Sequence, residues 1–96
     1  MSNIEFLTEL EDVIRSRRTS STEDSYTKTL FTRGTPYIAQ KVGEEAVELA
    51  IAAVLGDKAR TVSEAADLMY HLLVLLEDND LSLTDLAAEL SARHSN

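Results

Sequence analysis

Two apolar stretches of this chain are each interrupted by acidic residues, and this pattern constrains the fold more than any other feature. Between Val42 and Leu55 there are ten apolar residues, one glycine and three glutamates. Between Ala65 and Leu76 the polar breaks, apart from Tyr70, are one aspartate and one histidine. Carboxylates are rarely buried unless they are paired or bind a metal. Two largely apolar helices with acids on one stripe therefore indicate a cation site.

Helical geometry places the acids of each stretch on one side of its helix. At about 100° per residue, Glu44, Glu48 and Glu45 fall near 0°, 40° and 100° of the first helix. On the second helix Glu64 and Asp67 lie within roughly 60° of each other. Like charges so placed repel one another unless a cation lies between them. Antiparallel packing of the two helices would surround one volume with carboxylate oxygens, the ligands that suit Mg²⁺ or Mn²⁺.

The alternative is a pair of amphipathic helices whose acidic stripes face solvent. A solvated helix face normally mixes positive and negative residues. Lys41 lies on the acidic arc, about one turn before the glutamates, but no Lys, Arg or Gln lies beside these acids after it. The pattern therefore favours a site over a solvated face.

Composition limits the class of protein. A chain of 96 residues predicts a single domain, residues 1–96. A net charge of −8 argues against a nucleic-acid partner, and the absence of cysteine excludes disulfides and cysteine-based zinc sites. No apolar run approaches the roughly 20 residues that span a bilayer. The polar, acidic opening does not resemble a signal segment, so we expect no membrane association and a cytoplasmic location.

Hydrophobic periodicity predicts an all-α fold, with no strand. The expected helices cover about residues 3–18, a short segment that ends at Phe31 or Thr32, Thr35 to about Leu55, a following helix to Leu76 or Glu77, and a last helix to about Arg93. Capping signals mark their boundaries: Ser21-x-x-Asp24, Thr35 before Pro36, Gly56 as a stop, Asp57 as the next cap, and the capping box Ser82-x-x-Asp85.

The third and fourth of these helices are apolar around most of their circumference. Only two or three short helices remain to cover them, and large uncovered apolar patches usually mark an interface. We therefore expect a homodimer in which these helices complete a four-helix core. A monomer is the alternative.

Three segments of the chain resemble the phosphoribosyl-ATP pyrophosphohydrolase family, within the all-α, MazG-like nucleotide pyrophosphohydrolases. They are Ser25-Tyr26-Thr27, the run from Gln40 to Glu48 (QKVGEEAVE), and the run from Glu64 to Leu76 (EAADLMYHLLVLL). The resemblance extends from the first helix to about Leu90. The acidic motifs alone indicate the superfamily, and the flanking residues narrow it to this family.

This resemblance implies a MazG-like helical bundle and a specific reaction. Such enzymes cleave the α–β phosphoanhydride of phosphoribosyl-ATP by attack of water, which gives phosphoribosyl-AMP and pyrophosphate, the second step of histidine biosynthesis. The carboxylates would hold Mg²⁺, or Mn²⁺ in its place, to neutralise phosphate oxygens and activate water. Some members also contain a cyclohydrolase domain, for which we expect no room in this chain.

The family motifs also imply roles for individual residues. By motif position the metal ligands are Glu45, Glu48, Glu64 and Asp67, and Glu44 is either a further ligand or the general base. The substrate-binding residues implied are Arg17, Ser25, Tyr26, Thr27 and Lys41. Each has a structural alternative: a salt bridge for Lys41, a solvated helix end for Arg17, and capping and packing for residues 25–27. His71 is either a substrate contact or a core histidine with satisfied hydrogen bonds.

Two other functions compete with this one. A different nucleotide pyrophosphohydrolase, acting for example on dNTPs or dUTP, would use the same acids. A non-catalytic helical module would present the acids to a protein partner and would bind no Mg²⁺.

Overall fold

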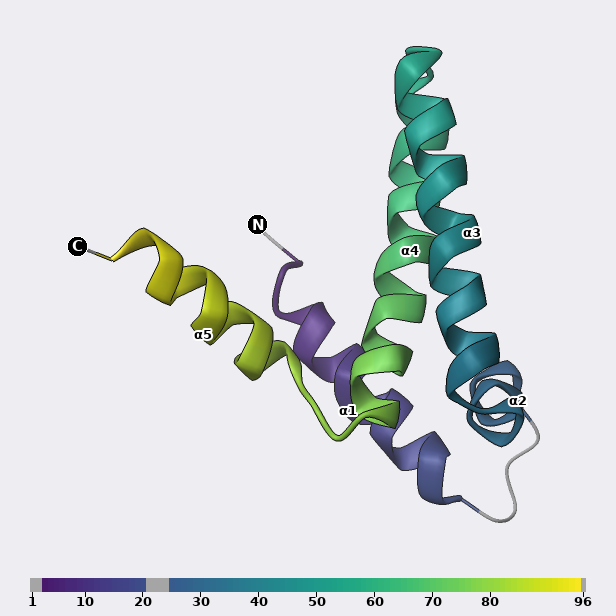
Figure 1. The fold of residues 1–96 in the computed structure, drawn as a ribbon, viewed down its shortest axis with the longest axis vertical. Coiled ribbons are helices and arrows are strands. Elements are labelled where there is room, and N and C mark those ends of the chain that lie inside the picture. Colours follow the sequence, from purple (N-terminus) through teal and green to yellow (C-terminus); the bar gives the residue numbers. More distant parts are fainter. Residues whose placement is uncertain (1–2, 21–24, 96) are drawn as a thin grey trace.

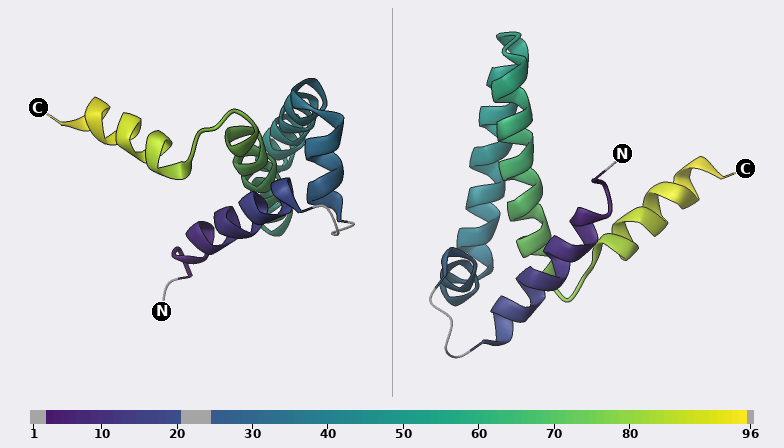
Figure 2. Two further views of the ribbon diagram at one scale, coloured as in Figure 1. Left: turned by 90° about the horizontal axis from the view of Figure 1, so that it is seen from below. Right: turned by 180° about the vertical axis from the view of Figure 1, so that it is seen from behind.

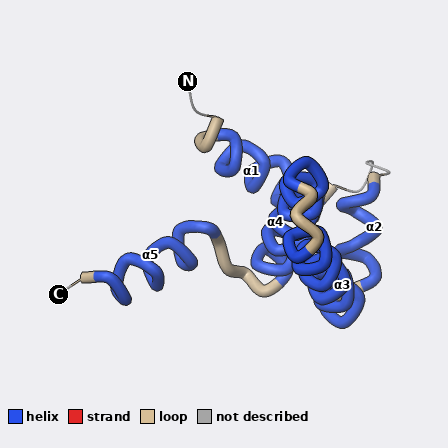
Figure 3. The backbone as a smooth tube through the Cα atoms, turned by 90° about the horizontal axis from the view of Figure 1, so that it is seen from above, coloured by secondary structure: helices blue, strands red, loops and turns tan. Residues whose placement is uncertain are grey.

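The described part of the chain folds into helices joined by loops and turns. The computed structural model describes residues 3–20 and 25–95, and no strand occurs within these ranges (Figure 1, Figure 3). The helices are α1 (Phe6–Thr19), α2 (Tyr26–Arg33), α3 (Thr35–Val54), α4 (Lys58–Asp78) and α5 (Leu83–His94). The all-α prediction is confirmed. None of these helices combines the length and apolar character needed to cross a membrane.

Helices α3 and α4 form a long antiparallel hairpin, which is the most extensive helix–helix contact of the domain (Figure 1). Gly56 ends the first arm with a φ of +74°, a left-handed conformation that favours glycine. The Asp57 side chain then caps α4 by accepting a hydrogen bond from the Arg60 amide at 3.0 Å. Both predicted boundary signals are confirmed.

A single residue, Gly34, joins α2 to α3. Its φ is +91°, and its N–H donates to the Leu30 carbonyl at 3.1 Å. The chain therefore changes direction within one residue, and α2 crosses the base of α3 at a steep angle (Figure 2). The predicted Thr35 cap is wrong, because Gly34 is the N-cap of α3 and the Thr35 hydroxyl donates to Asp78 instead.

Serine side chains cap the starts of α2 and α5. The Ser25 side chain accepts a hydrogen bond from the Lys28 amide at 3.1 Å and so begins α2. The predicted Ser21-x-x-Asp24 cap lies outside the described residues. At α5 the predicted capping box between Ser82 and Asp85 is confirmed.

The apolar core lies at the base of the hairpin, at the end opposite Gly56. Four helices supply its fully buried side chains, which are Ile14, Leu30, Ile38, Leu73 and Val74. In Figure 1 the half of the hairpin nearest the turn extends beyond the other helices. That half therefore depends on the mutual packing of α3 and α4.

Charged groups fasten α1 to the end of α4 and to the start of α5. The Arg15 guanidinium lies 3.3 Å from the buried Glu77 carboxylate, and Arg18 Nη1 donates to the Glu77 carbonyl at 2.6 Å. Glu11, also buried, accepts a hydrogen bond from the Leu83 amide at 2.7 Å. Beyond this anchor α5 has no buried residue and projects away from the hairpin (Figure 1).

The cap at the hairpin turn predicts a stability change. Asp57→Ala leaves the first amides of α4 without this partner, so we expect the free energy of unfolding to fall by about 1 kcal/mol. Chemical denaturation followed by circular dichroism measures it. Ser63→Ala, at an exposed position of the same helix, should change stability by less than about 0.5 kcal/mol. Equal effects of both substitutions would contradict the role of the cap.

Candidate active site

Glu45 and Glu48 of α3 meet Glu64 of α4 in a cluster that we call the acid trio. One carboxylate oxygen from each residue lies within 4.8 Å of the other two. The hairpin produces this arrangement, because the middle of α3 runs antiparallel to the first half of α4. The structure therefore brings together three of the four predicted metal ligands.

The trio is partly removed from water. Glu45 is 8% exposed, and burial raises its pKa, to which the charge of Glu48 adds. Burial also raises the pKa of Glu64, and the hydrogen bond to Glu48 acts in the same direction. These shifts indicate carboxylates that are held together against their mutual repulsion.

One oxygen of the trio lacks a partner. Glu64 Oε2 is buried and accepts no hydrogen bond from any described residue. Buried polar atoms are nearly always hydrogen-bonded, so an exception needs a reason. A hard divalent cation with oxygen ligands would both satisfy this atom and screen the three charges. The residues present therefore fit Mg²⁺ or Mn²⁺ better than they fit a solvated acidic stripe.

The fourth predicted ligand, Asp67, lies beside the trio rather than within it. Its side chain is exposed, and its carboxylate is not part of the 4.8 Å cluster. Its charge nevertheless contributes to the raised pKa values of Glu45 and Glu64, so it is electrostatically close to both.

Glu44 is not a member of the trio and forms its contacts within its own helix. Its Oε2 accepts a hydrogen bond from Gln40 Nε2 at 3.1 Å, and this bond is the main reason that the pKa of Glu44 is lowered. Lys41 Nζ lies 3.5 Å from Glu44 Oε1 and 3.8 Å from Glu45 Oε1. The predicted salt-bridge alternative for Lys41 is thus observed. Burial lowers the pKa of Lys41, but the charges of Tyr26 and Glu44 raise it overall.

Helix α2 reaches the site through aromatic and hydroxyl groups. The Tyr26 hydroxyl lies 2.9 Å from His71 Nε2, and the Thr27 and Tyr70 hydroxyls are hydrogen-bonded. His71 Nδ1 lies 2.8 Å from the Asp67 carbonyl oxygen, so both ring nitrogens have partners. His71 is therefore the satisfied core histidine that was one of the two alternatives. Sequence reasoning missed Tyr70, although its place beside His71 in the second motif was a usable signal.

The structure also describes two further residues that were predicted to bind substrate, Ser25 and Arg17. Ser25 is the N-cap of α2, so its capping alternative is observed. Arg17 is half-buried in the last turn of α1, a helix that contacts α2 and α4 at the base of the hairpin.

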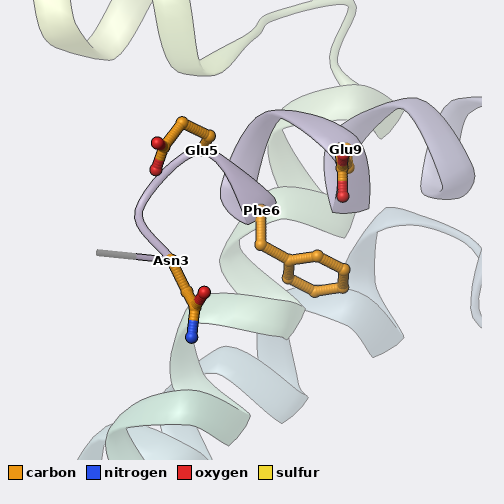
Figure 4. A pocket seen from close by; sticks show the side chains of 4 residues that line it. All are labelled: Asn3, Glu5, Phe6 and Glu9. Atoms are coloured by element: carbon orange, nitrogen blue, oxygen red, sulfur yellow. The ribbon is translucent and has the colours of Figure 1, made fainter. Parts of the chain in front are cut away.

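One of two open surface hollows lies beside the predicted site residues, and the other does not. Gly43, Glu44, Val47 and Glu48 line a shallow hollow on α3 next to the trio. A second hollow lies at the start of α1, where Figure 4 shows Phe6 and Glu9 with Asn3 and Glu5. The second hollow contains none of the predicted site residues, so we assign the site to the hairpin.

Comparison with known proteins agrees with the motifs. A model of the family described as phosphoribosyl-ATP pyrophosphohydrolase matches residues 7–94. The protein named histidine biosynthesis bifunctional protein HisIE is 61% identical over 89 residues in Shewanella oneidensis, covering 93% of this chain and 42% of that protein. Its namesake in Pasteurella multocida is 56% identical over 90 residues, covering 94% and 45%. The chain spans less than half the length of these relatives.

The raised pKa of Glu64 predicts a pH-dependent stability change in metal-free protein. The folded carboxylate binds a proton more readily than the unfolded one, so ionised Glu64 destabilises the fold near neutral pH. The effect disappears as the pH falls through the raised pKa toward the ordinary value of 4.5. Glu64→Gln should therefore raise the melting temperature at pH 7 in a chelator, and the gain should shrink on acidification.

Glu9→Gln, at an exposed position of α1, serves as the matched control and should change little. A gain for Glu64→Gln that stayed constant with pH, or a loss of stability at pH 7, would contradict this account of the site.

Proposed function

This chain belongs to the phosphoribosyl-ATP pyrophosphohydrolase family, and on that premise we propose that it hydrolyses phosphoribosyl-ATP to phosphoribosyl-AMP and pyrophosphate. Water would attack at the α–β phosphoanhydride, the second step of histidine biosynthesis. The observation that supports this most is the acid trio with its unpartnered buried oxygen, located on the two family motifs. The relatives named above, which are histidine biosynthesis proteins, support the pathway.

We propose Mg²⁺ as the cofactor, with Mn²⁺ as a substitute, held by Glu45, Glu48 and Glu64. We include Asp67 as a fourth ligand on its motif position, and its charge contributes to the raised pKa of Glu64. When bound, the cation would supply charge neutralisation of the phosphate oxygens. The protein contributes the preformed positions of the three carboxylates, which face one volume before any ligand binds.

Lys41 and Glu44 have complementary tasks in this proposal. The ammonium of Lys41 lies at the edge of the trio, where a phosphate could replace its contacts with Glu44 and Glu45. Glu44, which is not a member of the trio, is the spare carboxylate that could orient water or accept its proton. Tyr26 and Thr27 bring α2 to the same region, and Arg17 with Ser25 completes the proposed substrate contacts.

Kinetic variants test these roles. Each of the four proposed ligands is replaced by alanine in turn: Glu45, Glu48, Glu64 and Asp67. We expect each substitution to reduce kcat by at least about 100-fold and to abolish Mg²⁺ binding. Glu44→Gln should reduce kcat but retain the rise in melting temperature that millimolar Mg²⁺ produces. Lys41→Ala and Arg17→Ala should mainly raise KM, because a phosphate contact acts in the ground and transition states alike.

The assay is pyrophosphate release from phosphoribosyl-ATP, ATP and dNTPs, with and without Mg²⁺. Preference for a dNTP would indicate a different nucleotide pyrophosphohydrolase. A folded protein without Mg²⁺ binding or turnover would indicate a non-catalytic module. Near-wild-type turnover in any two of the four ligand variants would show that the site is misplaced, and Glu9→Gln controls for loss of surface charge.

We further propose a homodimer formed mainly by α3 and α4. The side of α3 away from α4 exposes Val47, Ile51 and Val54, which are 59%, 48% and 87% exposed. Ala50, Ile51, Val54 and Leu55 line a hollow without polar surface. Exposed apolar surface of this kind is typical of an interface.

Light scattering at micromolar concentration should give twice the monomer mass of 10.6 kDa. Val54→Asp should shift the protein toward the monomer because it places a charge in the apolar contact. Val13→Asp, at an exposed valine of α1, should leave the dimer intact. A wild-type mass near 10.6 kDa, or dissociation by Val13→Asp, would contradict this interface.

A further inference from the structure

His71 connects a half-exposed residue of α2 to the backbone of α4. Its Nε2 lies 2.9 Å from the Tyr26 hydroxyl, and its Nδ1 lies 2.8 Å from the Asp67 carbonyl oxygen. His71 itself is 5% exposed, whereas Tyr26 is 50% exposed. The imidazole is thus a buried link between a side chain that ligands can reach and the helix that contains Glu64 and Asp67.

The partners determine the tautomer and the direction of both hydrogen bonds. A carbonyl oxygen only accepts, so Nδ1 has the proton and donates it to Asp67. In the neutral imidazole Nε2 is then an acceptor, and the Tyr26 hydroxyl must donate. The position of that hydroxyl is therefore set by His71.

The ring of Tyr26 is held in a particular place by this bond. It packs against Tyr70 with centroids 6.2 Å apart and meets the His71 ring edge-on at 5.8 Å. The charge of Lys41 acts on the Tyr26 hydroxyl from the α3 side. Tyr26 thus packs on the aromatic residues of α4, with half of its surface open.

We infer that His71 is a positioning residue for nucleotide binding, which acts by holding Tyr26 against the bound substrate; this rests on the proposed function. This role depends on the hydrogen bond between Nε2 and the Tyr26 hydroxyl, and not on the one between Nδ1 and the Asp67 carbonyl. Helix α2 has a separate attachment to α4 through Thr27 and Tyr70, and Leu30 is fully buried in the core. Loss of the Tyr26–His71 bond therefore leaves α2 in place and frees only the tyrosine ring.

Two substitutions of His71 distinguish the hydrogen bond at one ring nitrogen from the hydrogen bond at the other. In His71→Gln the side-chain oxygen can take the place of Nε2 and accept from Tyr26, whereas in His71→Asn the shorter amide can take the place of Nδ1 and donate to Asp67. Tyr26→Phe removes the donor. His94, the other histidine of the chain, is exposed at the end of α5, so His94→Asn and His94→Gln are matched controls.

We expect His71→Asn and Tyr26→Phe each to raise KM for phosphoribosyl-ATP roughly fivefold with kcat within about twofold of wild type. In the His71→Gln variant, by contrast, KM should stay near the wild-type value. The double variant Tyr26→Phe/His71→Asn should be no worse than either single variant, because both remove one interaction. The His94 variants should match wild type.

Calorimetric titration with AMP in Mg²⁺ gives a second measurement that does not need turnover. The affinity for AMP should follow the same order, so the inference is tested even if wild-type protein fails to cleave phosphoribosyl-ATP, which would contradict the proposed function alone. Additive losses in the double variant, unchanged KM and AMP affinity in both single variants, or absence of AMP binding by wild type would overturn the inference. So would rescue by His71→Asn instead of His71→Gln, which would assign the effect to the Asp67 carbonyl.

Discussion

The contact between α3 and α4 holds like charges together, and the proposed cation site depends on that contact. Glu45 is buried, and one oxygen of Glu64 is buried without a hydrogen-bond partner. Repulsion and desolvation oppose this arrangement, and the apolar residues along both helices offset it by removing their surface from water. The proposed cation site is thus part of a helix interface, so whatever changes helix packing also changes the positions of the ligands.

The base of the hairpin brings a second set of groups to the acids. Gly34 allows α2 to turn directly into α3, and Leu30 then packs in the core. The same turn places Tyr26 and Thr27 against α4, on the side where Lys41 meets Glu45. Acidic groups from the hairpin and neutral or basic groups from its base therefore converge at one place.

The helices and the acidic stripe were predictable because periodicity and capping are local properties of the chain. It was harder to predict which of the acids lie together, because this depends on how α3 is rotated against α4. Glu44 and Glu45 are adjacent in sequence, yet Glu45 faces α4 while Glu44 bonds to Gln40. Thr35 failed as a cap for a related reason: the junction needs a positive φ, which outweighed the preference for a hydroxyl at that position.

We expect local stability to decline along the hairpin from its base to its turn, because the large fully buried side chains lie at the base and the buried side chain near the turn is the small Ala52. Within a single chain the arms near Gly56 pack on each other, and Val54 and Leu55 are 87% and 68% exposed there. The acid trio lies between these regions. A cation shared by both arms would couple their opening, so that the hairpin would unfold as one cooperative unit instead of fraying from its turn.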